Sequence, residues 1–368
     1  MSSELRTIPW WQPELGGKEL PLVNEVLESN YLNDGEVTRK LEKLFAARVQ
    51  AEFAVGTTSG TAALALALQA VGVGYGDEVL VPDITFIATA NAVTLAGAKV
   101  VLVDIDPKSL GMCPKDMIQK ITDSTKAVVP VHISGRGTTI YDIAKIARAH
   151  NLFVIEDAAE ALGSYYKGDF LGTIGDLGCY SLSPNKTITS GQGGVIVTNS
   201  DSWLKRLREL KDQGRAVQGT GADDEHVSVG YNFKLTNIQS AIGLGQFELL
   251  EMRLERLRRN YIIYCEELSA IDGVQLFPVD VEGQETPQWT DGLFDRKDKL
   301  YEYLHNKNIH CRKFWFPIHQ SKPYFSRDEL FPNSTAIWES AMWLPSSFKM
   351  TDDDIRYVSH LILKFYNT

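Results

Sequence analysis

The stretch "LFVIEDAAEALGS", Leu152–Ser164, indicates the class of fold. Its apolar residues run directly into Glu156 and Asp157, which is typical of a strand that is buried on both faces and ends at the edge of a sheet. Further apolar runs bounded by Gly, Pro or Asp lie between residues 52 and 199: "EVLVPD", "KVVLVDI", "AVVPVHI", "GCYSLS" and "GGVIVT". Segments with helical spacing separate them: "GTAALALALQAVG", "ITFIATANAVTLAG" and "TIYDIAKIARAHN". This alternation predicts an α/β domain with a mainly parallel sheet.

The length of the chain predicts two domains. A single core stops growing near ~250 to 300 residues, and the chain has 368. The segment 235–269 keeps helical spacing and is predicted to lead from the large domain into the small one. We place the large domain at residues 1–250 and a small α+β domain at 251–368, which closes with an amphipathic helix capped by Thr351.

Composition excludes several classes of protein. The formal net charge of -10 and the pI near 5.3 argue against a protein that binds a nucleic-acid backbone. No run approaches the roughly 20 apolar residues that cross a bilayer, and the N-terminal "MSSELRTIPWW" lacks the layout of a signal peptide, so we expect a cytoplasmic protein. The four cysteines are widely spaced and no H-E-x-x-H occurs, so no metal site is expected.

The segment "FAVGTTSGTAAL", Phe53–Leu64, has the pattern of a strand, a Gly/Thr/Ser turn and an Ala-rich helix. Free N–H groups at the start of a helix, with hydroxyl groups beside them, favour a bound phosphate. An ordinary capped helix explains the same pattern equally well. The segment matches neither a P-loop nor the G-x-G-x-x-G fingerprint.

Two further residues give this turn a chemical meaning. Asp157 ends a buried strand, where open α/β sheets bind ligands, and a buried carboxylate needs a cation or a metal unless it only caps a helix. Lys186, in "SLSPNKTITSGQGG", follows one strand later. A single lysine in a loop is usually a solvated charge, but phosphate turn, acid and lysine together match pyridoxal 5'-phosphate (PLP). The turn binds the phosphate, the acid pairs with the pyridine nitrogen, and the lysine forms a Schiff base.

The order of segments along the chain extends this interpretation. The chain carries, in sequence, "GTTSGTAALALAL", "VPDITFIATANAV", "VLVDID", "VVPVH", "VIEDAAEALGS", "SLSPNKTITSGQGGVIVTN", "GYNFKLTNIQSAIGL" and "WFPIHQSKPY". It strongly resembles the DegT/DnrJ/StrS family of PLP-dependent nucleotide-sugar aminotransferases over nearly its whole length. The resemblance implies the aspartate aminotransferase-like fold type I, with a mostly parallel seven-stranded sheet and an N-terminal arm, about residues 1–30, near the active site.

The resemblance also implies roles for individual residues. Lys186 is the Schiff-base lysine and proton carrier, Asp157 pairs with the pyridine nitrogen, and Phe86 stacks on the ring. The phosphate is expected to contact Ser181 and the turn formed by Thr58, Ser59, Gly60 and Thr61. Asn232 is expected to reach the phosphate of a neighbouring subunit, so the resemblance implies a homodimer with shared active sites.

The substrate side is expected to include His319, with Tyr324 on the same wall, and Lys313 and Trp289 from the neighbouring segments. The segments near residues 31–40 and 283–299 are also expected to face the sugar. Two residues depart from the usual family pattern. Glu160 stands where many members carry Gln, beside the phenolic oxygen of the cofactor, and Lys234 stands where Arg is more usual.

The implied reaction is a transamination in two halves, with L-glutamate as the amino donor. Resemblance to perosamine-, legionaminate- and bacillosamine-type enzymes favours amination at C4 of an NDP-4-keto-6-deoxyhexose, for surface polysaccharide or amino-sugar synthesis. The alternatives are an NDP-3-keto-sugar aminotransferase and a PLP-dependent sugar dehydratase, although dehydratases of this fold carry His in place of the lysine. A non-catalytic transcription regulator would need a DNA-reading module, and a Rossmann-type dehydrogenase would need its glycine fingerprint; neither pattern is found.

Overall fold

The large sheet confirms the α/β class and its mostly parallel arrangement. In a computed structural model that describes residues 6–137, 139–215 and 225–368, seven strands of those residues pair in the order β1-β9-β8-β5-β4-β2-β3. All strands point the same way except β9, which runs antiparallel to both neighbours. The strands are β1 (Phe53–Thr57), β2 (Glu78–Pro82), β3 (Lys99–Val103), β4 (Thr125–Val128), β5 (Phe153–Asp157), β8 (Leu177–Ser181) and β9 (Gly194–Thr198).

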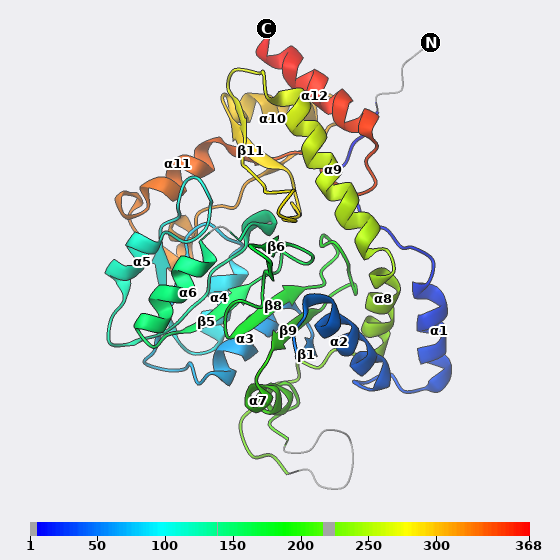
Figure 1. The fold of residues 1–368 in the computed structure, drawn as a ribbon, viewed down its shortest axis with the longest axis vertical. Coiled ribbons are helices and arrows are strands. Elements are labelled where there is room, and N and C mark those ends of the chain that lie inside the picture. The colour runs from blue at the N-terminus through cyan, green and yellow to red at the C-terminus, as the bar shows by residue number, and fades with distance from the viewer. Residues whose placement is uncertain (1–5, 138, 216–224) are drawn as a thin grey trace.

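Helices cover both faces of this sheet, which explains why its strands are continuous apolar runs. One buried cluster joins the sheet to α3 (Gly60–Ala70), α4 (Ala88–Leu95) and α7 (Asp201–Lys211) through residues such as Leu68, Val93 and Leu207. The other joins it to α2 (Glu36–Val49), α5 (Pro114–Lys120) and α6 (Ile140–Ala149) through residues such as Phe45 and Ile143. Figure 1 shows the helices around the sheet, with α7 below it.

The long helical pattern of residues 235–269 is two helices rather than one. α8 (Asn237–Phe247) begins at a capping box between Thr236 and Gln239 and packs against α1 (Glu19–Ser29). α9 (Leu250–Leu268) follows after a break at residues 248–249 and rises toward the second sheet (Figure 1). The break gives each helix its own direction, so α8 stays on the large sheet's side and α9 reaches the C-terminal part.

The second sheet is small and antiparallel, as the α+β pattern of the C-terminal third predicts. Its order is β10-β11-β13-β12, and it packs with α9 and two further helices around Ile263, Leu300 and Ile362. The elements are β10 (Val274–Leu276), β11 (Asp291–Phe294), α10 (Lys297–His305), β12 (Arg312–Lys313), α11 (Pro332–Ser340), β13 (Ala341–Trp343) and α12 (Asp352–Tyr366). Thr351 caps α12, as predicted: its Oγ1 accepts from the N–H of Asp354 at 3.2 Å.

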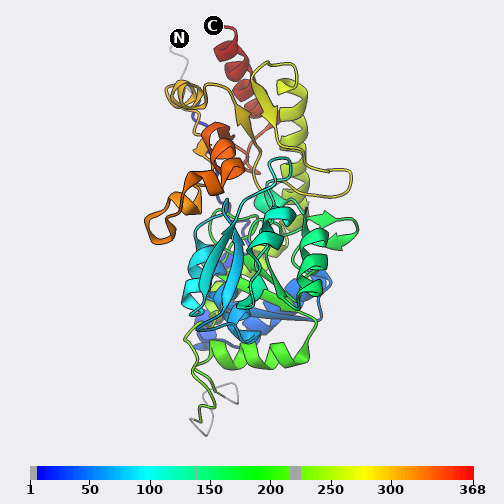
Figure 2. The ribbon, with the colours of Figure 1, turned by 90° about the vertical axis from the view of Figure 1, so that its left-hand side faces the viewer.

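Short elements complete the described chain: a two-stranded ribbon of β6 (Tyr165–Tyr166) and β7 (Asp169–Phe170), and the 3-10 turns Ile133–Gly135, Ile318–Gln320, Lys322–Tyr324 and Asp328–Leu330. Figure 2 shows the small sheet with its helices above the large one along the long axis. The N-terminal segment ties both parts together, since Ile8 bridges to Ile309 and the carbonyl of Glu14 accepts from Arg253. The domain boundary at residue 250 stays a prediction. Within the described residues, no helix is both long enough and apolar enough to span a membrane.

Candidate active site

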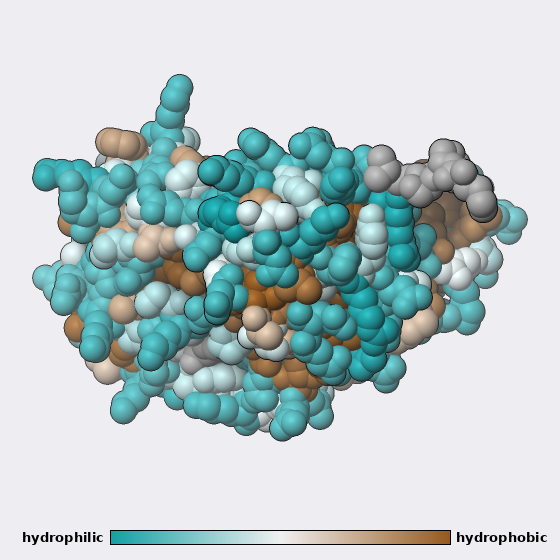
Figure 3. Space-filling model, turned by 90° about the horizontal axis from the view of Figure 1, so that it is seen from above, coloured by the Kyte–Doolittle hydropathy of each residue, from teal (hydrophilic) through white to brown (hydrophobic). Residues whose placement is uncertain are grey.

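A cavity of about 310 Å³ lies where parallel strands of the large sheet end. β5 ends at Asp157 and β8 at Ser181, and the turn after β1 leads into α3, so three carboxyl ends meet at one edge. Figure 3 shows the molecule from above as a largely hydrophilic face with apolar side chains gathered in hollows between the polar ones. The lining includes eight of the predicted residues: Ser59, Gly60, Thr61, Phe86, Asp157, Glu160, Ser181 and Lys186.

Lys186 is a largely buried lysine, with 11% of its side chain exposed. It lies in the loop between β8 and β9, and its Nζ is 3.7 Å from Oε1 of Glu160 and 4.8 Å from the centre of the Trp289 ring. Burial lowers the pKa of Lys186, and the nearby carboxylates of Glu160 and Asp157 oppose that change. The environment therefore favours a neutral amine more than water does, which is what a Schiff-base lysine requires.

The carboxylate of Asp157 is held by two donors. The hydroxyl of Thr89 on α4 donates to Oδ2 at 2.8 Å, and the N–H of Ala159 donates to Oδ1 at 3.2 Å. Burial raises the pKa of Asp157, and these two donors together with the charge of Lys186 oppose the change. A protonated ring nitrogen in the cavity would supply the cation that this buried acid lacks.

The start of α3 forms a cradle for an anion. Ser59 caps the helix: its Oγ accepts a hydrogen bond from the N–H of Ala62 at 3.1 Å, and its carbonyl accepts one from the N–H of Ala63. Among the described residues, the N–H groups of Gly60 and Thr61 have no such partner. A Cβ on Gly60 would lie 3.1 Å from that of Ser181, so glycine allows the close approach of the two strand ends. This geometry suits a phosphate group.

Thr58 differs from its neighbours. Its N–H donates to the carbonyl of Phe233 at 3.1 Å, and its side chain does not line the cavity. Within this chain Thr58 thus fastens the turn to the segment before α8, and the cradle itself is formed by the three residues after it. Its contact with a phosphate stays a prediction that the geometry of the single chain does not support.

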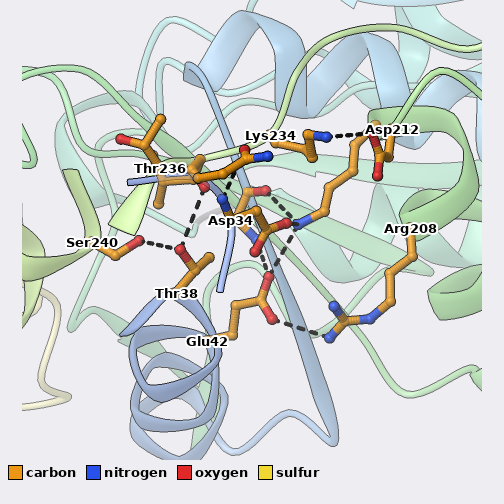
Figure 4. Close-up of polar contacts among 12 residues, drawn as sticks. Asp34, Thr38, Glu42, Arg208, Asp212, Lys234, Thr236 and Ser240 are labelled. Atoms are coloured by element: carbon orange, nitrogen blue, oxygen red, sulfur yellow. Dashed lines mark hydrogen bonds and ion pairs between the residues drawn. The ribbon is translucent and has the colours of Figure 1, made fainter. Parts of the chain in front are cut away.

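A network of buried charges lies beneath this turn (Figure 4). Lys211 Nζ lies 3.0 Å from Oδ2 of Asp34 and 3.4 Å from Oε1 of Glu42, and it donates to the carbonyl of Gly56 at 3.1 Å. Glu42 also accepts from the N–H of Gly56 at 2.8 Å and from Arg208 at 3.0 Å. Both backbone groups of Gly56 are thereby fixed, and the turn begins two residues later.

The segment of residues 31–40 therefore supports the cradle from behind. Thr38 donates toward Asn237, and its Oγ1 lies 2.8 Å from that of Ser240 (Figure 4). Lys234 forms an ion pair with Asp212, so in this chain the lysine at that position has a partner on the C-terminal end of α7. The expectation that the segment faces the sugar stays a prediction.

Phe86 is positioned to cover one face of a bound ring. Its side chain is 52% exposed although it is aromatic, it lines the cavity, and its ring centre is 5.2 Å from that of Trp315. A half-exposed phenylalanine at a cavity is a natural surface for a planar ligand. Its predicted stacking on the cofactor agrees with this placement.

His319 has a different environment from the one expected of a substrate contact. Its side chain is fully buried, with Nδ1 2.6 Å from Oδ2 of Asp83 and Nε2 3.0 Å from Oδ1 of Asp328. Its ring stacks on Phe331, and its N–H donates to Asp83 at 2.8 Å. His319 does not line the cavity, and both ring nitrogens are engaged. In this chain it ties the segment after β2, which carries Phe86, to the C-terminal part.

The remaining predicted residues, three on the substrate side and the phosphate contact Asn232, also lie apart from the lining. The hydroxyl of Tyr324 is bonded to Asn91 at 2.8 Å and lies 2.9 Å from that of Thr94, on the outer side of α4. Lys313 is exposed and forms an ion pair with Asp298. Trp289 is fully buried behind Lys186, and Asn232 is exposed on the segment before α8. Only Trp289 among these approaches the lysine.

Arg312 is a cavity residue that sequence patterns do not reveal. It lies on β12, and its guanidinium carbon is 4.8 Å from the ring centre of Trp10, 5.0 Å from that of Trp315 and 5.6 Å from that of Trp343. Among the described residues it forms no ion pair with a carboxylate. Burial lowers the pKa of Arg312, and Glu160 opposes the change. The aromatic run around "CRKFW" is the one signal in the sequence that an arginine here would be stacked.

Comparison with known proteins agrees with this geometry. The model of the DegT/DnrJ/EryC1/StrS aminotransferase family matches residues 13–363. The GDP-perosamine synthase of Escherichia coli O157:H7 is 36% identical over 99% of this chain and 100% of its own, and that of Caulobacter vibrioides is 36% identical over 96% of both. The crystal structure of S. venezuelae DesV in complex with a ketimine intermediate superimposes with a TM-score of 0.92 at 26% identity, covering 98% of this chain and 99% of that one.

The residues of the cavity fit the cofactor of this family, pyridoxal phosphate. The N-terminus of α3 and Ser181 offer donors for a phosphate, the buried carboxylate of Asp157 can pair with a cation, and the amine of Lys186 lines the same cavity. The half-exposed ring of Phe86 offers an apolar surface between them. A neutral or purely apolar ligand would offer no charged or reactive partner to Asp157 and Lys186.

Proposed function

The chain belongs to the DegT/DnrJ/EryC1/StrS aminotransferase family, and from that premise we propose that it aminates C4 of an NDP-4-keto-6-deoxyhexose with L-glutamate as the donor. It is a PLP-dependent transaminase that acts on sugars. The observation that carries the proposal is the largely buried Lys186 beside Glu160, in one cavity with Asp157 and the cradle at α3. This arrangement supports reversible transfer of an amino group.

Each proposed cofactor contact follows from a side chain already described. Ser59, Gly60, Thr61 and Ser181 would bind the phosphate, and Asp157 would pair with the ring nitrogen while Thr89 keeps its carboxylate in place. Phe86 would cover one face of the ring. When bound, pyridoxal phosphate supplies an aldehyde that reacts with amines and a ring that withdraws electrons from the adjacent carbon.

Lys186 would act as the proton carrier in both halves of the reaction. With the cofactor and a substrate amine bound, Lys186 Nζ would be a free amine in a site that favours the neutral form. A neutral amine accepts a proton from the donor's α-carbon, and the resulting ammonium is stabilised by Glu160 at 3.7 Å. In the second half Lys186 Nζ would return a proton to the sugar carbon.

Arg312 supports a donor that carries a carboxylate. Three indole rings hold its planar group at the cavity without an anionic partner among the described residues. A guanidinium stacked on aromatic rings keeps its in-plane N–H donors available for a bidentate bond with a carboxylate. The α-carboxylate of an amino acid whose nitrogen reaches the Lys186 position is a ligand of this kind, and glutamate is the donor we propose.

The acceptor proposal rests on the relatives. The two relatives above are called GDP-perosamine synthase and match this chain over nearly its full length at 36% identity. We therefore propose a GDP-linked 4-keto-6-deoxy sugar as the first acceptor to test. An NDP-3-keto sugar is the alternative acceptor.

We also propose a homodimer in which each active site uses both chains. Asn232 is exposed and lies outside the cavity of its own chain, which agrees with a contact to a neighbouring subunit. Mixing chains that carry Lys186→Ala with chains that carry Asn232→Ala tests this directly. If sites are shared, the mixture regains part of the activity that both parents lack; if each chain forms its own site, mixing restores nothing.

The function itself is tested with purified protein loaded with PLP. Glutamate should deplete the visible absorption of the lysine-bound cofactor, and the product should then aminate GDP-, UDP- or dTDP-linked 4-keto-6-deoxy sugars, with the GDP sugar fastest. Mass spectrometry and NMR of the sugar product give the position of the new amine. An unchanged spectrum with every donor refutes transamination, and preference for a 3-keto sugar refutes amination at C4.

A further inference from the structure

Ser134 has a backbone conformation that is uncommon for a residue with a Cβ. It lies in the 3-10 turn after β4 with φ 50° and ψ 27°, in the left-handed region, and it is fully buried. Such strain persists only where the surroundings hold the residue in place, and it is frequent beside functional sites. Ser134 lies two residues beyond His132 and next to Gly135, which is also left-handed.

The left-handed turn brings the N–H of Ser134 to Glu160. That N–H donates to Oε2 of Glu160 at 2.8 Å, while Oε1 of the same carboxylate lies 3.7 Å from Nζ of Lys186. Glu160 is therefore held between a fixed backbone donor and the reactive amine. A change of the backbone at Ser134 would change the position of the carboxylate that faces Lys186.

A buried ion pair between Asp291 of the second sheet and Arg136, two residues after Ser134, holds Ser134 in this conformation. The Ser134 hydroxyl donates to Oδ2 of Asp291 at 2.6 Å, and Asp291 forms a bidentate pair with Arg136, whose Nη1 lies 3.1 Å from Oδ2. Trp343 Nε1 donates to the same hydroxyl at 3.3 Å, and the carbonyl of Ser134 accepts from the N–H of Gln288 at 3.1 Å. Each of these groups is buried.

We propose that Ser134 is a positioning residue which, locked by the Arg136–Asp291 pair, keeps Glu160 as a carboxylate beside the Lys186 nitrogen. The proposal rests on the proposed function because it assigns a purpose to the amine of Lys186. It links the second sheet to the reactive lysine through one continuous chain of contacts: Arg136, Asp291, Ser134, Glu160 and Lys186.

The charges around Glu160 show why such a donor matters. Burial raises its pKa, and the acids Asp157 on β5 and Asp291 on β11 raise it further. Lys186 and the N–H of Ser134 oppose this, and Arg312 on β12 also interacts favourably with Glu160. Loss of the Ser134 donor shifts the balance toward a protonated Glu160. A neutral Glu160 no longer stabilises positive charge on the lysine nitrogen, so the pKa of that nitrogen falls.

The test compares Ser134→Ala with Ser134→Gly in the full chain. Alanine is still disfavoured at positive φ but lacks the hydroxyl that holds the turn, so the backbone should relax and move its N–H away from Glu160. Glycine adopts positive φ without strain, so its N–H should stay in place. Ser164→Ala is the matched control, because the Ser164 hydroxyl also joins the large domain to the segment before β11, bonding Thr286 at 2.8 and 3.1 Å, without touching Glu160. Melting temperatures give the structural cost of each change.

Two pH titrations supply the decisive readouts. In the holoenzyme, the midpoint of the visible spectral change of the lysine-bound cofactor should move to lower pH by about 0.5 to 1 in Ser134→Ala, less in Ser134→Gly and not in Ser164→Ala. In the cofactor-free chain, the pH dependence of Lys186 acylation, followed by peptide mass spectrometry, should shift in the same order. This second titration needs neither donor nor acceptor, so it succeeds or fails independently of the proposed reaction.

Equal midpoints in Ser134→Ala and Ser164→Ala, at similar losses of melting temperature, overturn the proposal and leave Ser134 a purely structural residue. A larger shift in Ser134→Gly than in Ser134→Ala also overturns it, because the left-handed backbone would then not be the cause. If Ser134→Ala does not fold, Ser134→Gly is compared with Glu160→Gln instead. A wild-type midpoint in Ser134→Gly with a shifted midpoint in Glu160→Gln supports the proposal. Equal midpoints in these two variants contradict it.

Discussion

The Nζ atom of Lys186 lies 3.7 Å from Oε1 of Glu160, and the two side chains are only 11% and 6% exposed. Burial acts on the two groups in opposite directions: it lowers the pKa of the lysine and raises that of the glutamate, while their mutual attraction opposes both changes. The proton is therefore finely balanced between Lys186 and Glu160, and small changes in their surroundings alter which of the two groups carries it. This property is useful where a lysine must both accept and release a proton.

Glu160→Gln tests the electrostatic side of this pair. The amide keeps the shape and removes the negative charge that raises the pKa of the lysine nitrogen, so the midpoint of the visible titration should fall to lower pH. We expect a larger fall than in Ser134→Ala, because the charge itself is lost. A midpoint at or above the wild-type value would contradict the assigned role of Glu160.

Lys186→Ala should abolish turnover, with a loss of at least roughly 10³-fold, because the amine that moves the proton is gone. The visible band of the lysine-bound cofactor should disappear as well. Lys205→Ala is the matched control: Lys205 is 76% exposed and pairs only with Asp201 on the surface of α7. The assignment fails if Lys186→Ala retains the band or if both variants lose activity alike.

Asp157→Asn should separate folding from cofactor binding. Because burial raises the pKa of Asp157 above its unfolded value, the cofactor-free chain loses stability as pH rises through the folded pKa, and the charge is a cost at neutral pH. The cofactor-free variant should thus melt no lower than wild type at pH 7 to 8. The rise in melting temperature on adding PLP should shrink, and turnover should fall roughly 10²-fold. An undiminished rise with PLP would exclude the proposed pairing.

Arg312→Lys should raise the KM for glutamate roughly 10- to 100-fold, because lysine keeps the charge but loses the bidentate fork. The effect on kcat and on the visible spectrum should be small by comparison. Steady-state kinetics with glutamate and with a simple amine that lacks a carboxylate distinguish the two cases. If both donors are affected equally, Arg312 acts on the ring cluster rather than on the donor.

His319→Ala should destabilise the fold by about 3 kcal/mol, since it leaves the fully buried Asp83 without its strongest partner. Burial already raises the pKa of Asp83, and His319 opposes that change. Denaturant unfolding measures the loss, and Asp83→Asn should make a second loss at His319 smaller in a double-mutant cycle. A raised KM for the sugar with unchanged stability would instead restore His319 as a substrate contact.

Much of the fold could be predicted because its strands and helices have strong local patterns. Strand β9 is buried at all five positions and α3 at seven, so continuous apolar runs and an Ala/Leu-rich helix identify them without tertiary information. Asp157 could be found because it ends β5, and Lys186 because it lies in the Ser/Pro- and Gly-rich loop that follows the next strand. The break between α8 and α9 could not, because helical spacing continues across residues 248–249 while the helix axis changes.

Other site residues were hidden because their importance depends on distant partners. In the sequence, Arg312 looks like the other basic residues of its segment. In the structure, Trp10 and Trp343, which are far from each other in the sequence, both contact its guanidinium group. Conversely, the sequence predicts His319 as a substrate contact, but both of its ring nitrogens are hydrogen-bonded, to Asp83 and to Asp328. Local sequence patterns contain no information about contacts between side chains that are hundreds of residues apart in the chain.

The sequence by itself determined the α/β class, the sheet, the family and the trio of phosphate turn, acid and lysine, because these depend on periodicity and on residues at the ends of strands. Only the tertiary structure decided how the lysine is tuned. The strained Ser134 with its neighbour Arg136, Glu160 and Asp291 come from three separate segments. Their effect on Lys186 is electrostatic, and electrostatic effects follow distance and burial in space, which a linear pattern does not contain.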